Sequence, residues 1–383
     1  MRVKNKTKTR LALPHFIWSQ IGAFCLSAAA SGCMFVRWWR LDEEGRQGVW
    51  WLYGVFTAFM CVGSVVGAAA WCFQTLTIAS FFIFSKNPLH SSQSNQLSSL
   101  ATIQTYSALF LFLYPLEVFC LSTVKLAVLD RMQDFCAAPG CARDKRIWRT
   151  AARAAMALVS AGCVVGLFGG IAAGVYRLQA ASFFANAAAS AASNASFADL
   201  AQQGSQRIQL AVEVQSVQNF AEMATLLLIV AVFVIVGVMC SRRITSSLEL
   251  TTGTAHAAIV DKAKHLRRQI FSTAAVVFVT FLLRAAFESF NAVSAFLQNL
   301  NEPGCHINEL CSDSSTMECP FPYNPYAHMQ LFLYFTPEFQ MIVVLISSPL
   351  ALLVALWNMT NGRTLQALTR NRQHMQPMLR DEA

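Results

Sequence analysis

Seven long apolar stretches constrain this chain more than any other feature of its sequence. Each holds about 20 or more mostly apolar residues, the length that a helix needs to cross the hydrocarbon core of a bilayer. All are too long and too uniformly apolar to be strands of a membrane barrel. The stretches are 16–36, 49–73, 105–129, 154–176, 220–240, 270–297 and 328–357. We therefore predict an all-α polytopic membrane bundle of seven transmembrane helices over 16–357, between a basic N-terminal tail (1–15) and a cytoplasmic tail (358–383).

The composition excludes the common soluble classes. Of the 383 residues, 55% are hydrophobic and only 13% are charged, whereas a soluble domain has about a quarter of its residues charged. A soluble enzyme, a disordered chain and a collagenous chain are therefore excluded. The net charge of +9 indicates basic loops on one face of a membrane rather than binding to nucleic acid.

The distribution of lysine and arginine predicts which connections are cytoplasmic. The connections 37–48, 130–153 and 241–268, together with the tail 358–383, contain 19 of the 29 basic residues, and the alternating set contains three. Positive residues are enriched in cytoplasmic loops. We therefore expect the connections that contain the 19 basic residues, and the C-terminus, to be cytoplasmic. The pattern does not distinguish the plasma membrane from an endomembrane.

The N-terminus conflicts with this assignment. Five basic residues crowd positions 2–10, and they lie outside if the stretch 16–36 spans the membrane. A bundle of six spans with both ends inside is the alternative. A cleaved signal peptide is rejected, because it would invert every later loop. The seven-span topology is preferred, since 21 uncharged, mostly apolar residues are hard to place elsewhere.

Two features of the connections expected outside fit an extracellular or luminal face. Asn194 begins an Asn-Ala-Ser acceptor sequence for N-glycosylation. Cys305, Cys311 and Cys319 cluster in a loop without lysine or arginine, where an oxidising environment permits disulfides. Their spacing with His306 fits no zinc motif, so neither a metal nor another cofactor is predicted.

Ionisable residues inside the apolar stretches are the strongest candidates for a functional site, because charge at membrane depth is costly and needs a partner or a wet cavity. Arg284 and Glu288 are four residues apart and share a helical face, which Asn291 extends. The sequence leaves open an isolated Arg284–Glu288 pair or a network that also includes carboxylates of other spans. The full predicted cluster is Glu117, Lys125, Arg284, Glu288, Asn291 and Glu338.

Two of these glutamates follow prolines closely. Pro115 and Pro337 precede Glu117 and Glu338, and a proline within a helix frees a carbonyl and kinks the chain. The pattern predicts hinges or a cavity beside the two carboxylates, although helix packing alone also accounts for such prolines.

Glycines at intervals of four residues form a stripe on the fourth stretch. A stripe of this kind lets another helix backbone approach closely. Packing inside one bundle is the main interpretation, and a homodimer face is the alternative. The stripe comprises Gly162, Gly166, Gly170 and Gly174.

The inner end of the third stretch carries Asp130 and Arg131, a pair that resembles the Asp-Arg motif of rhodopsin-like G-protein-coupled receptors. Seven spans, an external N-terminus, a basic third inner loop and a short amphipathic segment after the last span (363–370) are similar too. The chain lacks the family's Asn-Pro-x-x-Tyr and Cys-Trp-x-Pro patterns. The resemblance implies a cytoplasmic switch at Asp130 and Arg131 and a signalling partner at the basic inner loops.

No catalytic motif of a hydrolase, kinase, nucleotide-binding protein or metalloprotease occurs in the sequence, so we expect no enzymatic activity. A receptor-like signalling or sensing protein is the first hypothesis. An ion- or proton-coupled transporter or channel is the second, and a membrane scaffold or trafficking protein is the third. The expected partners are the lipid bilayer and a cytoplasmic protein, with no nucleic acid.

Overall fold

The computed structural model describes residues 3–40, 49–86, 93–136, 142–190, 197–251, 268, 275, 278–279, 282–294 and 329. These residues are almost entirely helical, and no strand occurs among them. The helices are α1 (Val3–Trp39), α3 (Val49–Lys86), α4 (Gln93–Cys136), α5 (Ala142–Ser190) and α6 (Phe197–Thr251). Residues 282–294 form a further helical segment, named here the 282–294 helix.

All five numbered helices are long and apolar enough to cross a membrane. The all-helical class and the multi-pass membrane character predicted from the sequence are therefore supported. The count of seven is not established by the described residues, because the stretch 270–297 is described in part and the stretch 328–357 at one position only.

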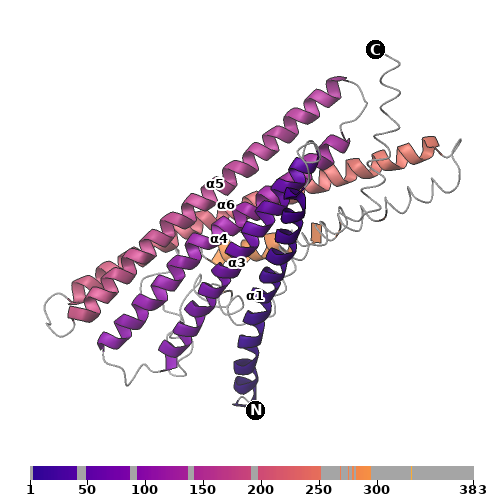
Figure 1. Ribbon diagram of the computed structural model, residues 1–383. Helices are drawn as coiled ribbons and strands as arrows, with labels where there is room; N and C mark the ends of the chain where they lie inside the picture. The colour runs from indigo at the N-terminus through magenta and orange to yellow at the C-terminus, as the bar shows by residue number, and fades with distance from the viewer. Residues whose placement is uncertain are drawn as a thin grey trace.

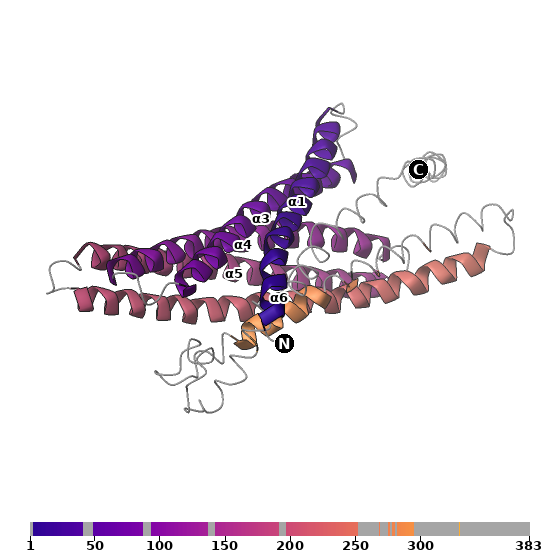
Figure 2. The ribbon, with the colours of Figure 1, turned by 90° about the horizontal axis from the view of Figure 1, so that it is seen from below.

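The helices pack in the order of the chain, with α1 against α3, α3 against α4, α4 against α5 and α5 against α6. Figure 1 shows α3 to α6 as an elongated group that α1 crosses at a steep angle. Seen from below in Figure 2, α5 and α6 run side by side along most of their length. In α1, Phe24, Ser27 and Ser31 are fully buried, and the hydroxyl of Ser64 in α3 donates to that of Ser27 at 2.9 Å. The stretch 16–36 is thus a helix within the bundle.

Helices α5 and α6 are much longer than a bilayer is thick. Their 49 and 55 residues correspond to about 74 and 82 Å, against about 30 Å of hydrocarbon. A cluster of buried apolar side chains joins the start of α4, the end of α5 and the start of α6, with Leu97, Ala180 and Phe184 among its members. We call this part of the bundle the extended end (residues 93–104, 177–190 and 197–211). The sequence before the fifth apolar stretch, from position 197 to 219, is thus helical and continuous with it.

The outer surface of α5 marks where lipid contacts the bundle. Large apolar side chains are exposed along this helix from Leu158 to Leu178, including Phe168 at 66% exposure. This face extends over about 20 residues, or about 30 Å, which matches the hydrocarbon thickness. A soluble protein rarely exposes so continuous an apolar strip, so the strip indicates contact with acyl chains.

The inner surfaces of α4, α5 and α6 share a pattern that hydropathy alone does not reveal. On each helix the inward residues follow one another at alternating steps of four and three, the spacing of a left-handed coiled coil. All are buried or half-buried. We call them the heptad seam. On α4 it comprises Leu97, Ala101, Gln104, Ala108, Leu111, Pro115, Val118 and Ser122; on α5, Val159, Cys163, Gly166, Gly170, Ala173, Arg177, Ala180, Phe184 and Ala187; on α6, Gly204, Ile208, Ala211, Gln215, Gln218, Glu222, Thr225, Ile229, Val232 and Val236.

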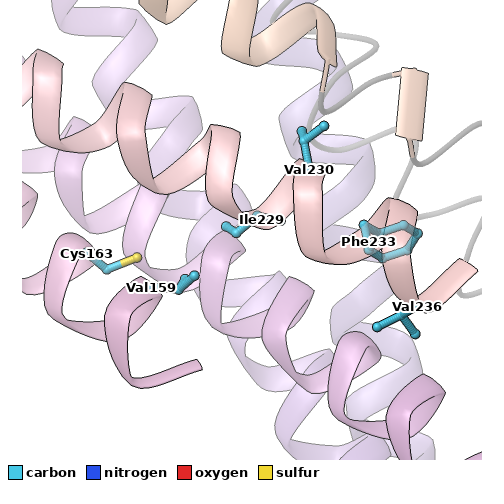
Figure 3. Packing of buried hydrophobic residues seen from close by; sticks show 6 residues of the cluster. All are labelled: Val159, Cys163, Ile229, Val230, Phe233 and Val236. Atoms are coloured by element: carbon cyan, nitrogen blue, oxygen red, sulfur yellow. The ribbon is translucent and has the colours of Figure 1, made fainter. Parts of the chain in front are cut away.

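The seam is apolar at one end and polar in its middle. Figure 3 shows Val159 and Cys163 of α5 beside Ile229, Val230, Phe233 and Val236 of α6, which form one buried cluster. Toward the extended end the seam instead holds glycine, alanine, glutamine and glutamate. Small residues on α5 let the neighbouring helices approach closely enough to bring those polar side chains together.

Candidate functional site

Six polar side chains from three helices meet in the interior of the bundle. They lie near the level of Gly166 and Gly170, about halfway along the exposed apolar face of α5. All six are almost completely buried. We call them the charge cluster: Tyr114, Glu117, Gln218, Glu222, Arg284 and Glu288.

Arg284 is tied to both its own helix and α4. Its Nε lies 3.1 Å from the Glu288 Oε1, and its Nη2 donates to the Tyr114 hydroxyl at 2.5 Å. The Tyr114 hydroxyl in turn donates to the Glu288 carboxylate. A guanidinium, a phenol and a carboxylate thus form a closed triangle. The predicted Arg284–Glu288 pair is present, but it is part of a network rather than an isolated pair.

Glu117 approaches this triangle from α4. Its side chain is fully buried and lies beside Gly67 of α3, where a Cβ would come within 3.0 Å of the Glu117 carboxyl carbon. The same Cβ would lie 2.6 Å from the ring of Phe24 in α1. The Arg284 charge interacts electrostatically with Glu117, Glu222 and Glu288. Glycine at position 67 therefore makes the room that this carboxylate occupies.

Glu222 and Gln218 of α6 belong to the cluster although the sequence analysis did not select them. The Gln218 amide Nε2 donates to the Glu222 Oε1 at 2.8 Å. Glu222 lies within the apolar stretch 220–240, yet it was not among the candidates selected from the sequence. The available signal was the heptad spacing, because positions 215, 218, 222 and 225 continue the inward face of α6 as a polar run.

Pro115 lies beside a small internal cavity between α4, α5 and α6. The cavity measures about 10 Å³ and its lining includes Ser122, Cys163, Glu222 and Thr225. A volume near this value is the minimum that holds one water molecule. The sequence predicted hinges or a cavity beside Glu117 and Glu338, whereas the lining of this cavity includes Pro115 and Glu222.

The glycine stripe of α5 is occupied by neighbours within the same chain. Added Cβ atoms would meet Thr225 at Gly162, Glu222 at Gly166, Pro115 at Gly170 and Phe112 at Gly174. These four glycines therefore pack against α4 and α6 inside the bundle, as the main interpretation of the stripe predicted.

A second polar layer lies at the start of the extended end. Arg177 of α5 donates through Nη1 to the Gln104 Oε1 at 3.0 Å and through Nη2 to the Gln215 Oε1 at 3.3 Å. All three residues are seam positions, so one guanidinium connects three helices. Polar residues inside a coiled-coil seam specify its register at a cost in stability.

Several predicted site residues lie elsewhere or outside the described part of the chain. Asn291 is half-buried on the 282–294 helix, three residues after Glu288. Lys125, Asp130 and Arg131 belong to α4, but their side chains are outside the description. The remaining candidates lie outside the described residues: Asn194, Cys305, Cys311, Cys319, Pro337 and Glu338.

The described residues contain no group of three or more histidine, cysteine, aspartate or glutamate side chains that could hold a metal ion. Comparison with known proteins identifies no relative: no family model, no curated protein and no solved structure matches this chain. The function must therefore be argued from the bundle itself.

Proposed function

We propose that this protein is a receptor-like signalling or sensing protein of a membrane, whose extended end faces outside and whose basic connections face the cytoplasm. The observation that supports it best is the continuity of the heptad seam. The seam runs without interruption from the extended end, through the Arg177 layer, to the charge cluster. If one end of a packed helix shifts along its axis, the other end shifts too, because a close-packed helix is hardly compressible.

The charge cluster provides the second part of the mechanism. Arg284 and Tyr114 connect the 282–294 helix to α4, so a shift of α4 along the seam changes the position of that helix. In the sequence this helix is preceded by the basic segment 262–268. Under the orientation given by the positive-inside rule, that segment is cytoplasmic and is the proposed contact for a signalling partner.

A test needs no knowledge of the natural stimulus. Ser94 and Ala188 face each other across the extended end, since the Ser94 hydroxyl donates to the Ala188 carbonyl at 3.0 Å. A Ser94→Cys, Ala188→Cys variant closed by copper phenanthroline supplies an artificial input. Spin labels on genetically encoded amino acids report the output at Arg242, near the C-terminal end of α6, and at Arg268, in the basic segment 262–268.

We expect oxidation to shift the distance distribution between the two labels, and the shift to disappear when Tyr114→Phe is added. A single-cysteine variant treated in the same way is the control. An unchanged distribution in protein shown by mass spectrometry to be cross-linked would overturn the sensing proposal and would favour a scaffold.

Proton- or ion-coupled transport is the second candidate function. The observation that favours it is the excess of acid in the charge cluster, where Glu117, Glu222 and Glu288 surround Arg284. Intramembrane carboxylates are characteristic of ion and proton pathways. Purified full-length protein in liposomes that contain a pH-sensitive dye separates the two functions. Dissipation of an imposed proton gradient by the unmodified protein but not by a Glu288→Gln variant would favour transport.

A further inference from the structure

Two carboxylates of the charge cluster, those of Glu288 and Glu222, differ in the partners that they have. Glu288 is matched by Arg284 and by the Tyr114 hydroxyl. Glu222 receives one hydrogen bond, from the Gln218 amide to its Oε1. Its Oε2 is buried and has no hydrogen-bond partner among the described residues.

The charge of Glu222 is poorly compensated where it lies. Arg284 donates its Nε and Nη2 to Glu288 and Tyr114, so the guanidinium is oriented toward those two groups. Glu117 and Glu288 add negative charge near Glu222. When carboxylates share a buried site, one of them takes up a proton because like charges disfavour a second ionised group. An ionised carboxylate in an apolar interior is costly unless it is paired and hydrogen-bonded, and the Glu222 Oε2 has no hydrogen-bond partner among the described residues.

The cavity gives this carboxylate access to a proton donor. Glu222 lies in its wall together with the hydroxyl-bearing residues Ser122 and Thr225, and its volume of about 10 Å³ suffices for one water molecule. Metal binding is a weaker interpretation, since the described residues contain no cluster of three metal-ligating side chains. A proton needs no such ligand set.

We propose that the Glu222 carboxyl is a proton-binding site that exchanges with water in this cavity. A hydronium ion transfers its proton to Oε2, which forms an O–H bond and leaves neutral water and a neutral carboxylic acid. The reverse step regenerates the carboxylate and the hydronium ion. The site goes beyond the proposed function, because it exists whether the chain signals or transports.

Groups from every element packed around Glu222 affect this exchange. Helix α4 contributes Glu117 and Tyr114, and the 282–294 helix contributes Arg284 and Glu288. Helix α5 contributes the Cys163 thiol to the cavity wall, and its other lining residues are uncharged: Gly162, Gly166 and Leu167. Among these, Arg284 favours the ionised acid and the two other glutamates favour the neutral one.

Infrared spectroscopy tests the proposal on the full chain in lipid nanodiscs. A protonated carboxylic acid has a carbonyl band that is separate from the carboxylate bands and that shifts in deuterated water. We expect such a band at neutral pH, its loss in Glu222→Gln, and its retention in Glu213→Gln. Glu213 is on the same helix but exposed, so it is a matched control for the same chemical change.

In the Glu222→Gln variant the introduced amide oxygen can still accept the Gln218 hydrogen bond, so the variant is expected to fold. If it does not, Glu222→Asp keeps the acid and must move the band rather than remove it. A band that persists unchanged in either variant assigns the proton to another glutamate and overturns the proposal. Conversion of the band to a carboxylate on replacing potassium with sodium at constant pH would overturn it in favour of a metal cation.

Discussion

Arg284 donates a hydrogen bond to the Tyr114 hydroxyl at 2.5 Å, and this contact joins two helices through residues that are 170 positions apart in the sequence. The Tyr114 ring is supported on the side of α4 and α3 by stacking on Phe110 and by the contact of Phe110 with Trp71. The phenol is therefore held in place before it meets the guanidinium. Through these hydrogen bonds Tyr114 connects α4 to the 282–294 helix.

The Tyr114→Phe variant removes this bridge and leaves the ring. We expect a loss of about 1 to 2 kcal/mol in the free energy of unfolding, the upper range for a polar contact between membrane helices, because both Arg284 and Glu288 lose a buried partner. Unfolding in mixed detergent micelles measures it. Tyr106→Phe is the control, since the Tyr106 ring is half-buried and stacks on Phe73; an equal loss in both variants would contradict the assigned role.

Gly170→Ala tests whether the glycine stripe is needed for packing inside one chain. The added methyl would meet the Pro115 ring and would lie 3.0 Å from the Leu111 carbonyl oxygen. We expect a destabilisation of about 1 to 3 kcal/mol, the usual cost of overpacking.

Gly237→Ala is the matched control for this change, because no atom of the described residues outside its own helical turn lies within 4 Å of the new methyl. It should be neutral or stabilise the fold by up to about 1 kcal/mol, since alanine restricts the unfolded chain. Thermal unfolding of both variants in the same detergent measures the difference in stability. An unchanged stability of Gly170→Ala would refute the close approach of α4 and α5.

Arg177→Leu tests the register of the heptad seam. The change removes the hydrogen bonds to Gln104 and Gln215 and places an apolar residue at a seam position, so alternative registers become accessible. In the Ser94→Cys, Ala188→Cys background we expect a several-fold lower yield of the 94–188 disulfide after brief oxidation. Leu178→Ala on the exposed face of α5 is the control and should leave the yield unchanged. A full yield in Arg177→Leu would show that apolar packing alone sets the register.

Epitope tags and glycosylation test the orientation of the bundle. A tag before Arg2 should be accessible to antibody in intact cells, and a tag after Ala383 only after permeabilisation. Treatment with an N-glycosidase should increase the electrophoretic mobility of the wild-type protein by more than that of Asn194→Gln, since Asn194 begins an acceptor sequence in the connection between α5 and α6. A protected N-terminal tag would contradict the seven-span topology and favour six spans.

The helices themselves were predictable because burial in lipid depends on local composition. Backbone groups in hydrocarbon must be paired within the segment, so a stretch such as 154–176 has few alternatives to a helix. The segment 180–190 lies beyond the predicted stretch 154–176, and it is helical as far as Ser190. Its alanines are poor hydropathy signals, but they recur every seven residues at Ala173, Ala180 and Ala187.

The sequence by itself determined the all-helical membrane class, the five long apolar helices and the Arg284–Glu288 pair, because each depends on residues close together in the chain. Only the tertiary structure decided which distant side chains share the interior. It added Tyr114, Gln218 and Glu222 to the charge cluster, and it assigned the glycines of α5 to contacts with α4 and α6. The physical reason is that a polar residue in a helix is exposed or buried according to the helix packed against it. That neighbour is fixed by the fit of small and large side chains along the heptad seam, not by the hydropathy of the helix alone.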